Sequence, residues 1–169
     1  MVILAFGVTA CGSDSGGGGS VEPMQSQAAS QPGEVACGRP FQLPAPGELR
    51  LTARFAKRVP AGEQTVSGTV EITSEHAVRG VAAAAADAFL VRAGRVVTTP
   101  LPQDAIGARW ELAADATRSV PAIASLRSCE QGGEPLAPGD YELYAQFVLT
   151  PDGGAPTTSY GGPWPLTVE

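Results

Sequence analysis

The residues best suited to chemistry are few: Cys11, Cys37, Cys129 and His76. A catalytic cysteine needs a base such as histidine, and a serine triad needs the same base. A structural zinc ion takes four ligands, usually in closely spaced pairs. His76 follows Ser74-Glu75 in a predicted turn, far along the chain from each cysteine. We therefore expect neither catalysis nor metal binding from these residues.

Carboxylates are the next candidates, because two of them that face a cleft can hydrolyse a glycosidic bond. Glu71, Glu75, Asp87 and Glu111 are spread over strand-like segments and their ends. Their spacing brings no two together, and solvated strand faces account for them better. Asp152 begins an Asp-Gly-Gly turn that lacks the further carboxylates of a calcium loop. The sequence thus predicts no enzyme, no cofactor and no metal.

The charge balance argues against nucleic acid as a partner. The 169 residues include 11 Lys and Arg against 17 Asp and Glu, for a net charge of −6. Nucleic-acid binding needs clustered basic residues that displace counterions from phosphates. Mild acidity mainly indicates a soluble surface.

The first ten residues, M-V-I-L-A-F-G-V-T-A, form an uncharged apolar run. The run is about half of the ~20 residues that a membrane-spanning helix needs. A short apolar run at the N-terminus is typical of the hydrophobic part of a signal peptide. We predict that residues 1–10 are a signal peptide, and that its usual basic beginning lies upstream of Met1.

The end of this run, Val8-Thr9-Ala10-Cys11, resembles the lipobox of bacterial lipoproteins. In that family an apolar residue and small residues precede a cysteine, which is acylated on sulfur before cleavage. The resemblance implies that Cys11 carries lipid and that the protein is anchored in the cell membrane on its extracytoplasmic face. Each buried CH₂ contributes ~0.8 kcal/mol, so two or more chains hold firmly.

Residues 11–33 are predicted to be a flexible linker between the anchor and the domain. The stretch is rich in Gly, Ser and Gln and has almost no apolar content. Such a segment cannot bury a core. About 22 residues of flexible coil span roughly 25 Å on average. The folded domain is expected to comprise residues 34–169.

Cys37 and Cys129 remain as an even pair in a chain that is predicted to be exported. In an oxidising compartment a disulfide is the default for such a pair. Two free thiols are the alternative, and a catalytic cysteine is disfavoured because the chain has a single histidine.

Alternation of apolar and polar residues predicts strands along most of the domain. In residues 141–149, for example, Tyr141, Leu143 and Phe147 lie on one face and Tyr144 on the other. Ala93-Gly94 suits a tight hairpin. Residues 81–86 are mostly alanine and favour a helix by propensity, but the run is short and lies between strand signals, so we expect either a strand or a strand with a turn. The predicted strands are 48–55, 66–73, 87–92, 95–97, 109–112, 118–124, 141–149 and 163–168.

Leu136-Ala-Pro-Gly-Asp-Tyr141 resembles the tyrosine corner of immunoglobulin-like and fibronectin-type domains. The resemblance implies that the Tyr141 hydroxyl bonds to backbone just upstream, and that the fold is an immunoglobulin-like β-sandwich of about seven strands. The chain departs from antibody domains because Cys129 precedes Tyr141 instead of following it.

Exposed aromatic residues and one turn are the candidates for binding. Tyr144 is predicted to project away from the core, and Tyr160 to lie in the loop before the last strand. Asp152 stands in the hairpin turn before that loop. Aromatic faces can stack on sugars or anchor a peptide. Trp164 is expected in the core.

These observations predict a noncatalytic, monomeric binding module on the cell surface, whose partner is an unknown protein or glycan. An inhibitor of exported proteases is the alternative, because residues 127–132 form an exposed loop beside Cys129 that could enter a protease cleft. An enzyme is the third and least favoured hypothesis.

Overall fold

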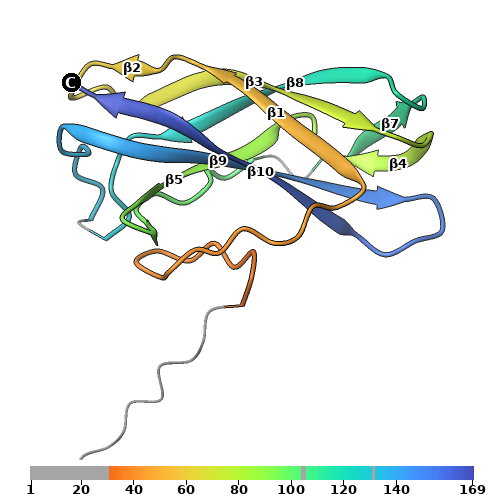
Figure 1. Cartoon of the computed structure of the whole chain (residues 1–169), viewed down its shortest axis with the longest axis horizontal. Coiled ribbons are helices and arrows are strands. Elements are labelled where there is room, and N and C mark those ends of the chain that lie inside the picture. The colour runs from red at the N-terminus through yellow and green to blue at the C-terminus, as the bar shows by residue number, and fades with distance from the viewer. Residues whose placement is uncertain (1–30, 104–105, 131) are drawn as a thin grey trace, which may run out of the picture.

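The computed structural model describes residues 31–103, 106–130 and 132–169, and these residues are all-β. Within them there are ten strands and no helix, so none that could cross a membrane (Figure 1). The predicted signal peptide, Cys11 and most of the predicted linker lie outside the described residues. The strands are β1 (Leu49–Phe55), β2 (Arg58–Val59), β3 (Thr65–Ser74), β4 (Val78–Ala82), β5 (Ala86–Arg92), β6 (Arg95–Val96), β7 (Ala108–Leu112), β8 (Thr117–Ser125), β9 (Gly139–Pro151) and β10 (Thr157–Val168).

The predicted all-β class is confirmed, although the strand count is ten and not about seven. Strands β2 and β6 contain two residues each, too few to show an alternating pattern. Strand β4 ends at Ala82 and β5 begins at Ala86, so the alanine run is a strand, a bend and a second strand, as expected. Ala93 and Gly94 join β5 to β6 with φ of 50° and 76°, the geometry of a tight hairpin turn.

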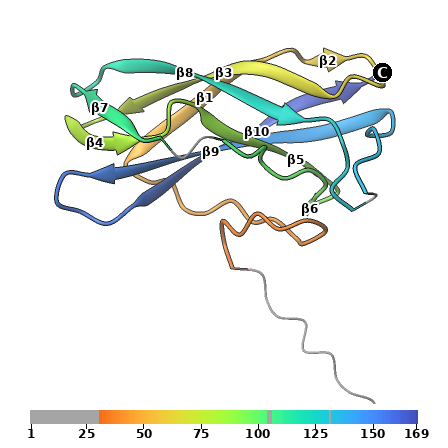
Figure 2. The same ribbon diagram turned by 180° about the vertical axis from the view of Figure 1, so that it is seen from behind.

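The strands pair into one curled sheet in the order β1-β3-β8-β5-β9-β10-β2, while β4 pairs with both β7 and β9 (Figure 2). Most pairs are antiparallel. The two parallel contacts, β5 with β8 and β10 with β2, involve two residue pairs each. The C-terminus therefore lies at one end of the domain and the β9–β10 hairpin at the other (Figure 1).

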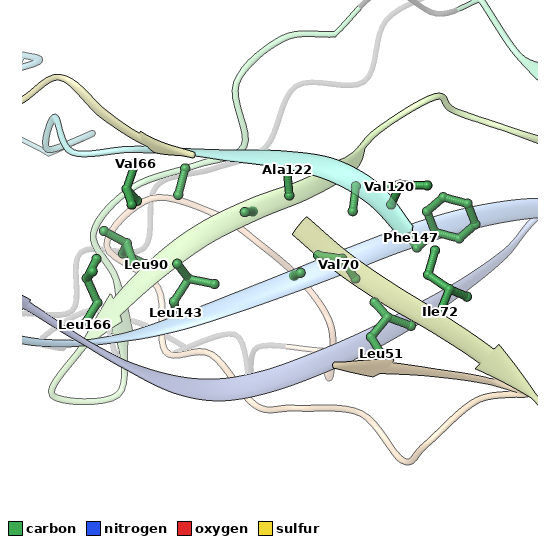
Figure 3. Packing of buried hydrophobic residues seen from close by; sticks show 14 of the residues in the cluster. Leu51, Val66, Val70, Ile72, Leu90, Val120, Ala122, Leu143, Phe147 and Leu166 are labelled. Carbon is green, nitrogen blue, oxygen red and sulfur yellow. The ribbon is translucent and has the colours of Figure 1, made fainter. Parts of the chain in front are cut away.

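The curl of the sheet encloses one main core (Figure 3). Val70 and Ile72 from β3 are fully buried, and so are Leu143 and Phe147 from β9. Each such side chain contributes about 1.5–3 kcal/mol when it is fully removed from water. The face of β9 that was predicted to be apolar is therefore the one that faces the core.

The predicted backbone bond of Tyr141 is present at the start of β9. Its hydroxyl donates a hydrogen bond to the carbonyl oxygen of Ala137 at 2.6 Å. Nη1 of Arg92 in turn donates to the Tyr141 hydroxyl at 3.1 Å, and the guanidinium carbon lies 5.0 Å from the ring centroid. The ring thus ties the approach to β9 to the β5–β6 hairpin.

We expect Tyr141→Phe to lower the free energy of unfolding by about 1 kcal/mol or more, because it removes the donor to Ala137 and the acceptor for Arg92. Tyr144→Phe is the matched control, since its hydroxyl bonds only to the exposed Glu142 within the described residues. Urea unfolding of both variants measures the difference. Equal losses of unfolding free energy in the two variants would show that the bonds of the Tyr141 hydroxyl do not stabilise the domain more than an exposed bond does.

Candidate functional site

Tyr144 is buried, which corrects the expectation from the sequence that its side chain is exposed. Only 8% of its surface is accessible. Residues 31–46, which we call the strap, cross the outer face of β5, β9 and β10 and cover it (Figure 1). The ring of Phe41 lies 4.8 Å from that of Tyr144 and 5.0 Å from that of Phe89. Alternation placed Tyr144 on the correct face, but it carries no information about a distant segment that covers that face.

The strap is joined covalently to the domain by the predicted disulfide, which is present between Cys37 and Cys129 with a Cα–Cα distance of 5.8 Å. Backbone hydrogen bonds also hold the part of the strap that follows Cys37. The Gly38 amide donates to Val96 at 2.9 Å, and the Phe41 amide donates to Gly94 at 2.9 Å. The strap therefore runs along the β5–β6 hairpin.

Tyr160 is also engaged within the molecule. It lies inside β10 and not in a loop, because β10 begins at Thr157 and crosses a bulge between Gly161 and Trp164 that hides its alternation. The Tyr160 hydroxyl donates to the Gly33 carbonyl at 2.9 Å. Trp164 is half-buried against the main core. Tyr160 thus helps to hold the beginning of the strap.

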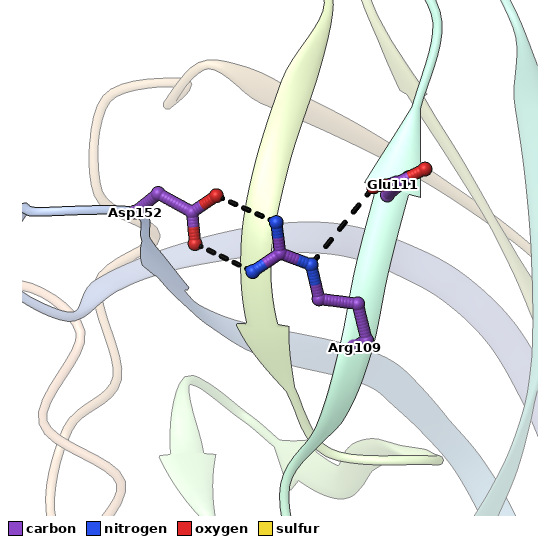
Figure 4. Close-up of polar contacts among 3 residues, drawn as sticks. All are labelled: Arg109, Glu111 and Asp152. Carbon is purple, nitrogen blue, oxygen red and sulfur yellow. Dashed lines mark hydrogen bonds and ion pairs between the residues drawn. The ribbon is translucent and has the colours of Figure 1, made fainter.

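Asp152 is the predicted site residue that remains exposed. Its carboxylate accepts two hydrogen bonds from Arg109 of β7, at 2.9 and 2.8 Å (Figure 4). Glu111 lies 3.9 Å from Nε of the same arginine. About half of each side chain is accessible to water, so this pair contributes at most about 1 kcal/mol to stability. Its main effect is to orient the carboxylate at the end of the domain.

Asp152 lies at the margin of an open groove of about 830 Å³. Three segments form its walls: the beginning of β1 with the residues before it, the β3–β4 turn, and the end of β9. The charged and polar side chains that line it are Glu48, Arg50, Ser74, Glu75, His76, Arg79 and Asp152. Two other grooves, of about 420 and 350 Å³, lie elsewhere on the surface.

The walls of this groove are fixed by short contacts between neighbouring segments. A Cβ on Gly80 would overlap the backbone of Thr150, so glycine lets β4 approach β9 closely. The Asp152 amide donates to the Arg79 carbonyl at 3.1 Å. In the β3–β4 turn, the His76 amide donates to the Ser74 hydroxyl at 3.3 Å. The hairpin and the turn are therefore held in one arrangement.

The lining of the groove suits recognition by charge. Arg50 forms an ion pair with Glu75 across the β1–β3 edge, while Glu48 and Arg79 form no side-chain bond within the described residues. These two charges, of opposite sign, remain available to a ligand. No group of three metal-ligating side chains occurs among the described residues. Sequence patterns missed the groove because its walls come from three separate segments. Of its lining residues, only Asp152 was predicted as a binding residue, from its place in a hairpin turn.

The protease-inhibitor alternative depends on the loop that begins at Arg127, and the structure shows a tight hairpin there. The Ser128 amide donates to Glu134 at 2.8 Å and the Gly133 amide donates to Ser128 at 3.0 Å. The Cys129 amide donates to Val97 at 2.9 Å. Arg127 and Glu130 are exposed on this hairpin, but much of its backbone is already paired.

Burial beneath the strap raises the pKa of Tyr144 and of Tyr160 above the ordinary value of 10.0, and the nearby Glu142 carboxylate raises that of Tyr144 further. The folded protein therefore holds these phenolic protons more tightly than the unfolded chain does. Their contribution to stability is complete below pH 10.0 and is lost as the pH rises through their folded pKa values.

We accordingly expect the free energy of unfolding to fall as the pH is raised above about 10, because the unfolded chain ionises first. The double variant Tyr144→Phe/Tyr160→Phe should show a shallower fall. Urea unfolding at several alkaline pH values measures both slopes. Identical slopes would mean that other groups control the alkaline transition.

No family model matches this chain, and no curated protein matches it. Among solved structures, a β-glucosidase from Listeria innocua in complex with glucose is similar, with 15% identity and a TM-score of 0.38 over 72% of this chain. This chain spans only 16% of that enzyme. The putative ApaA protein from Bordetella pertussis has 16% identity and a TM-score of 0.41, covering 71% of this chain and 91% of its own length. Likenesses this weak carry no conclusion about function.

Proposed function

We propose that this protein is a noncatalytic binding module, anchored by lipid at Cys11 to the extracytoplasmic face of the cell membrane. The anchor is supported by the lipobox-like Val8-Thr9-Ala10-Cys11 and by the polar residues that follow it. The disulfide between Cys37 and Cys129 agrees with an oxidising compartment. A flexible linker would let the domain search the space near the membrane.

In this proposal the curled sheet is an immunoglobulin-like sandwich. Its first layer is β1-β3-β8, and its second is β7-β4-β9-β10 with β5. The parallel pairing of β2 with the end of β10 and the bond from Tyr141 to Ala137 support this assignment. In antibody variable domains, the loop between strands B and C and the final hairpin between strands F and G lie at one end and form part of the binding surface. In this assignment they correspond to the β3–β4 turn and the β9–β10 hairpin.

The observation that carries the proposal is the groove between the β3–β4 turn and the β9–β10 hairpin. It lies at that same end of the domain, and its walls are already fixed by Gly80 and by the bond from Asp152 to Arg79. A preformed site loses little entropy on binding.

The chemistry of the lining favours a protein partner over a glycan. Sugar sites commonly use aromatic faces, and the groove has none. It offers Glu48 and Arg79 as charges of opposite sign, beside the ion pairs of Arg50 and Asp152. A partner segment that carries both signs would complement it.

We expect Arg79→Glu to reduce capture of the partner by at least about tenfold, because a negative charge would then face the acidic group of the partner that Arg79 is proposed to bind. The measurement is cross-linking of the full-length chain on cells of the native host. Arg58→Glu is the matched control, since Arg58 is an exposed arginine at the other end of the domain. Equal capture by the two variants would remove the groove from the proposal. Inhibition of serine, cysteine or metalloproteases by the same preparation would instead favour the inhibitor function.

The anchor has its own test, the intact mass of the protein extracted with detergent from its host. We expect a chain that begins at Cys11, carries acyl groups and lacks the two hydrogens of the Cys37–Cys129 bridge. Cys11→Ser should leave the chain unacylated and release it from membranes, because the anchor contributes ~0.8 kcal/mol per buried CH₂. An unprocessed chain that carries no lipid would contradict the proposed location.

A further inference from the structure

The strap lies outside the main core of the domain. The buried residues of that core begin at Leu49, after the strap ends. Val35 and Phe41 of the strap pack instead on a second, smaller cluster formed by Phe89, Val91, Val96 and Tyr144. The two clusters are on opposite faces of β5 and β9, since neighbouring residues of a strand point to opposite sides. The main core is therefore complete without the strap.

The strap is held by contacts of modest strength. Most of its residues are exposed, and Phe41 is only half-buried. Its noncovalent contacts include three backbone hydrogen bonds with the β5–β6 hairpin. The Tyr160 hydroxyl also donates to the Gly33 carbonyl, and the Arg95 guanidinium donates to the Gly38 carbonyl at 2.9 Å. Ordering a segment of this length costs backbone entropy at every residue. Segments with little burial and exposed hydrogen bonds open before the core does.

The covalent link is itself within reach of a reductant. Cys37 is exposed, and Cys129 is half-buried in the hairpin in which Arg127 pairs with Pro135. A thiolate of a dithiol can attack Sγ of Cys37, and the Cys129 thiolate then leaves. The second thiol of the reductant resolves the mixed disulfide, so two electrons and two protons pass to the cysteine pair.

We propose that the Cys37–Cys129 disulfide is a reversible latch, whose reduction by a dithiol frees the strap and uncovers the aromatic face of Phe89, Tyr144 and Tyr160 while the main core stays folded. In the oxidised protein the bond keeps the strap close to its docking face, so its weak contacts re-form whenever they break. In the reduced protein the same contacts must offset the full entropy of ordering. The latch does not require a partner in the groove, which the strap meets only at Pro46.

The test is hydrogen exchange, followed by mass spectrometry, on the full-length chain in its oxidised and dithiothreitol-reduced forms. Reduction should speed exchange in residues 31–46 and 94–97 at least about tenfold, and in β3 and β8 by less than about twofold. Unchanged exchange in the strap would overturn the latch. Equal acceleration in β3 would also overturn it, because the bond would then be a staple of the whole domain.

Two variants separate the bond from other effects of the reductant. Cys37→Ser/Cys129→Ser should show fast exchange in the strap without reductant and no further change with it; a further change would trace the effect to the reductant and overturn the latch. Phe41→Ala in the oxidised state should expose Tyr144 while the amide of Gly38 stays protected beside the bond. If Phe41→Ala frees the strap as fully as reduction does, the ring is the restraint and the latch is wrong.

Discussion

Strand β9 pairs with β4, β5 and β10, so its register sets the positions of most of the molecule. Leu143 and Phe147 must face inward for the main core to form. A slip of one residue would turn this face to solvent. The bond from Tyr141 to Ala137 fixes the point at which the strand begins, and the Asp152 turn fixes the point at which it ends. Both ends of β9 therefore carry residues whose roles depend on that register.

The register of β9 also decides what each of its two faces contacts. Its inward face packs in the main core, whereas its outward face would leave Tyr144 in water. The strap resolves this by covering that aromatic residue with Phe41. As a consequence, the outward face of β5 and β9 is covered by the strap. The charged groove at the β3–β4 turn is left as the open concave surface that the proposed function uses.

Local pattern predicted what depends on neighbours along the chain. Alternation located β1, β3, β8 and β9, and the hairpin at Ala93-Gly94 followed from glycine's freedom at positive φ. Local pattern failed where a residue contacts a segment that is far away in the sequence. Tyr144 was expected to be exposed because the strap that covers it lies about a hundred residues earlier. Tyr160 was expected in a loop because the bulge near Gly161 breaks the period of two. The groove escaped detection because no single segment contains it.

The position of Cys37 within the strap also determines how the domain bears a mechanical load. A force on the chain before Gln31 reaches residues 31–36 first, and these can peel away one contact at a time. At Cys37 the load passes through the disulfide to Cys129 and into the hairpin in which Arg127 pairs with Pro135. That hairpin is tied to the body of the domain by the bond from the Leu126 amide to the Gln64 carbonyl at 2.8 Å and by the bond from the Cys129 amide to the Val97 carbonyl at 2.9 Å, and Leu126 is buried in the main core. Tension would thus bypass Phe41 and pass through Cys129 into the body of the domain.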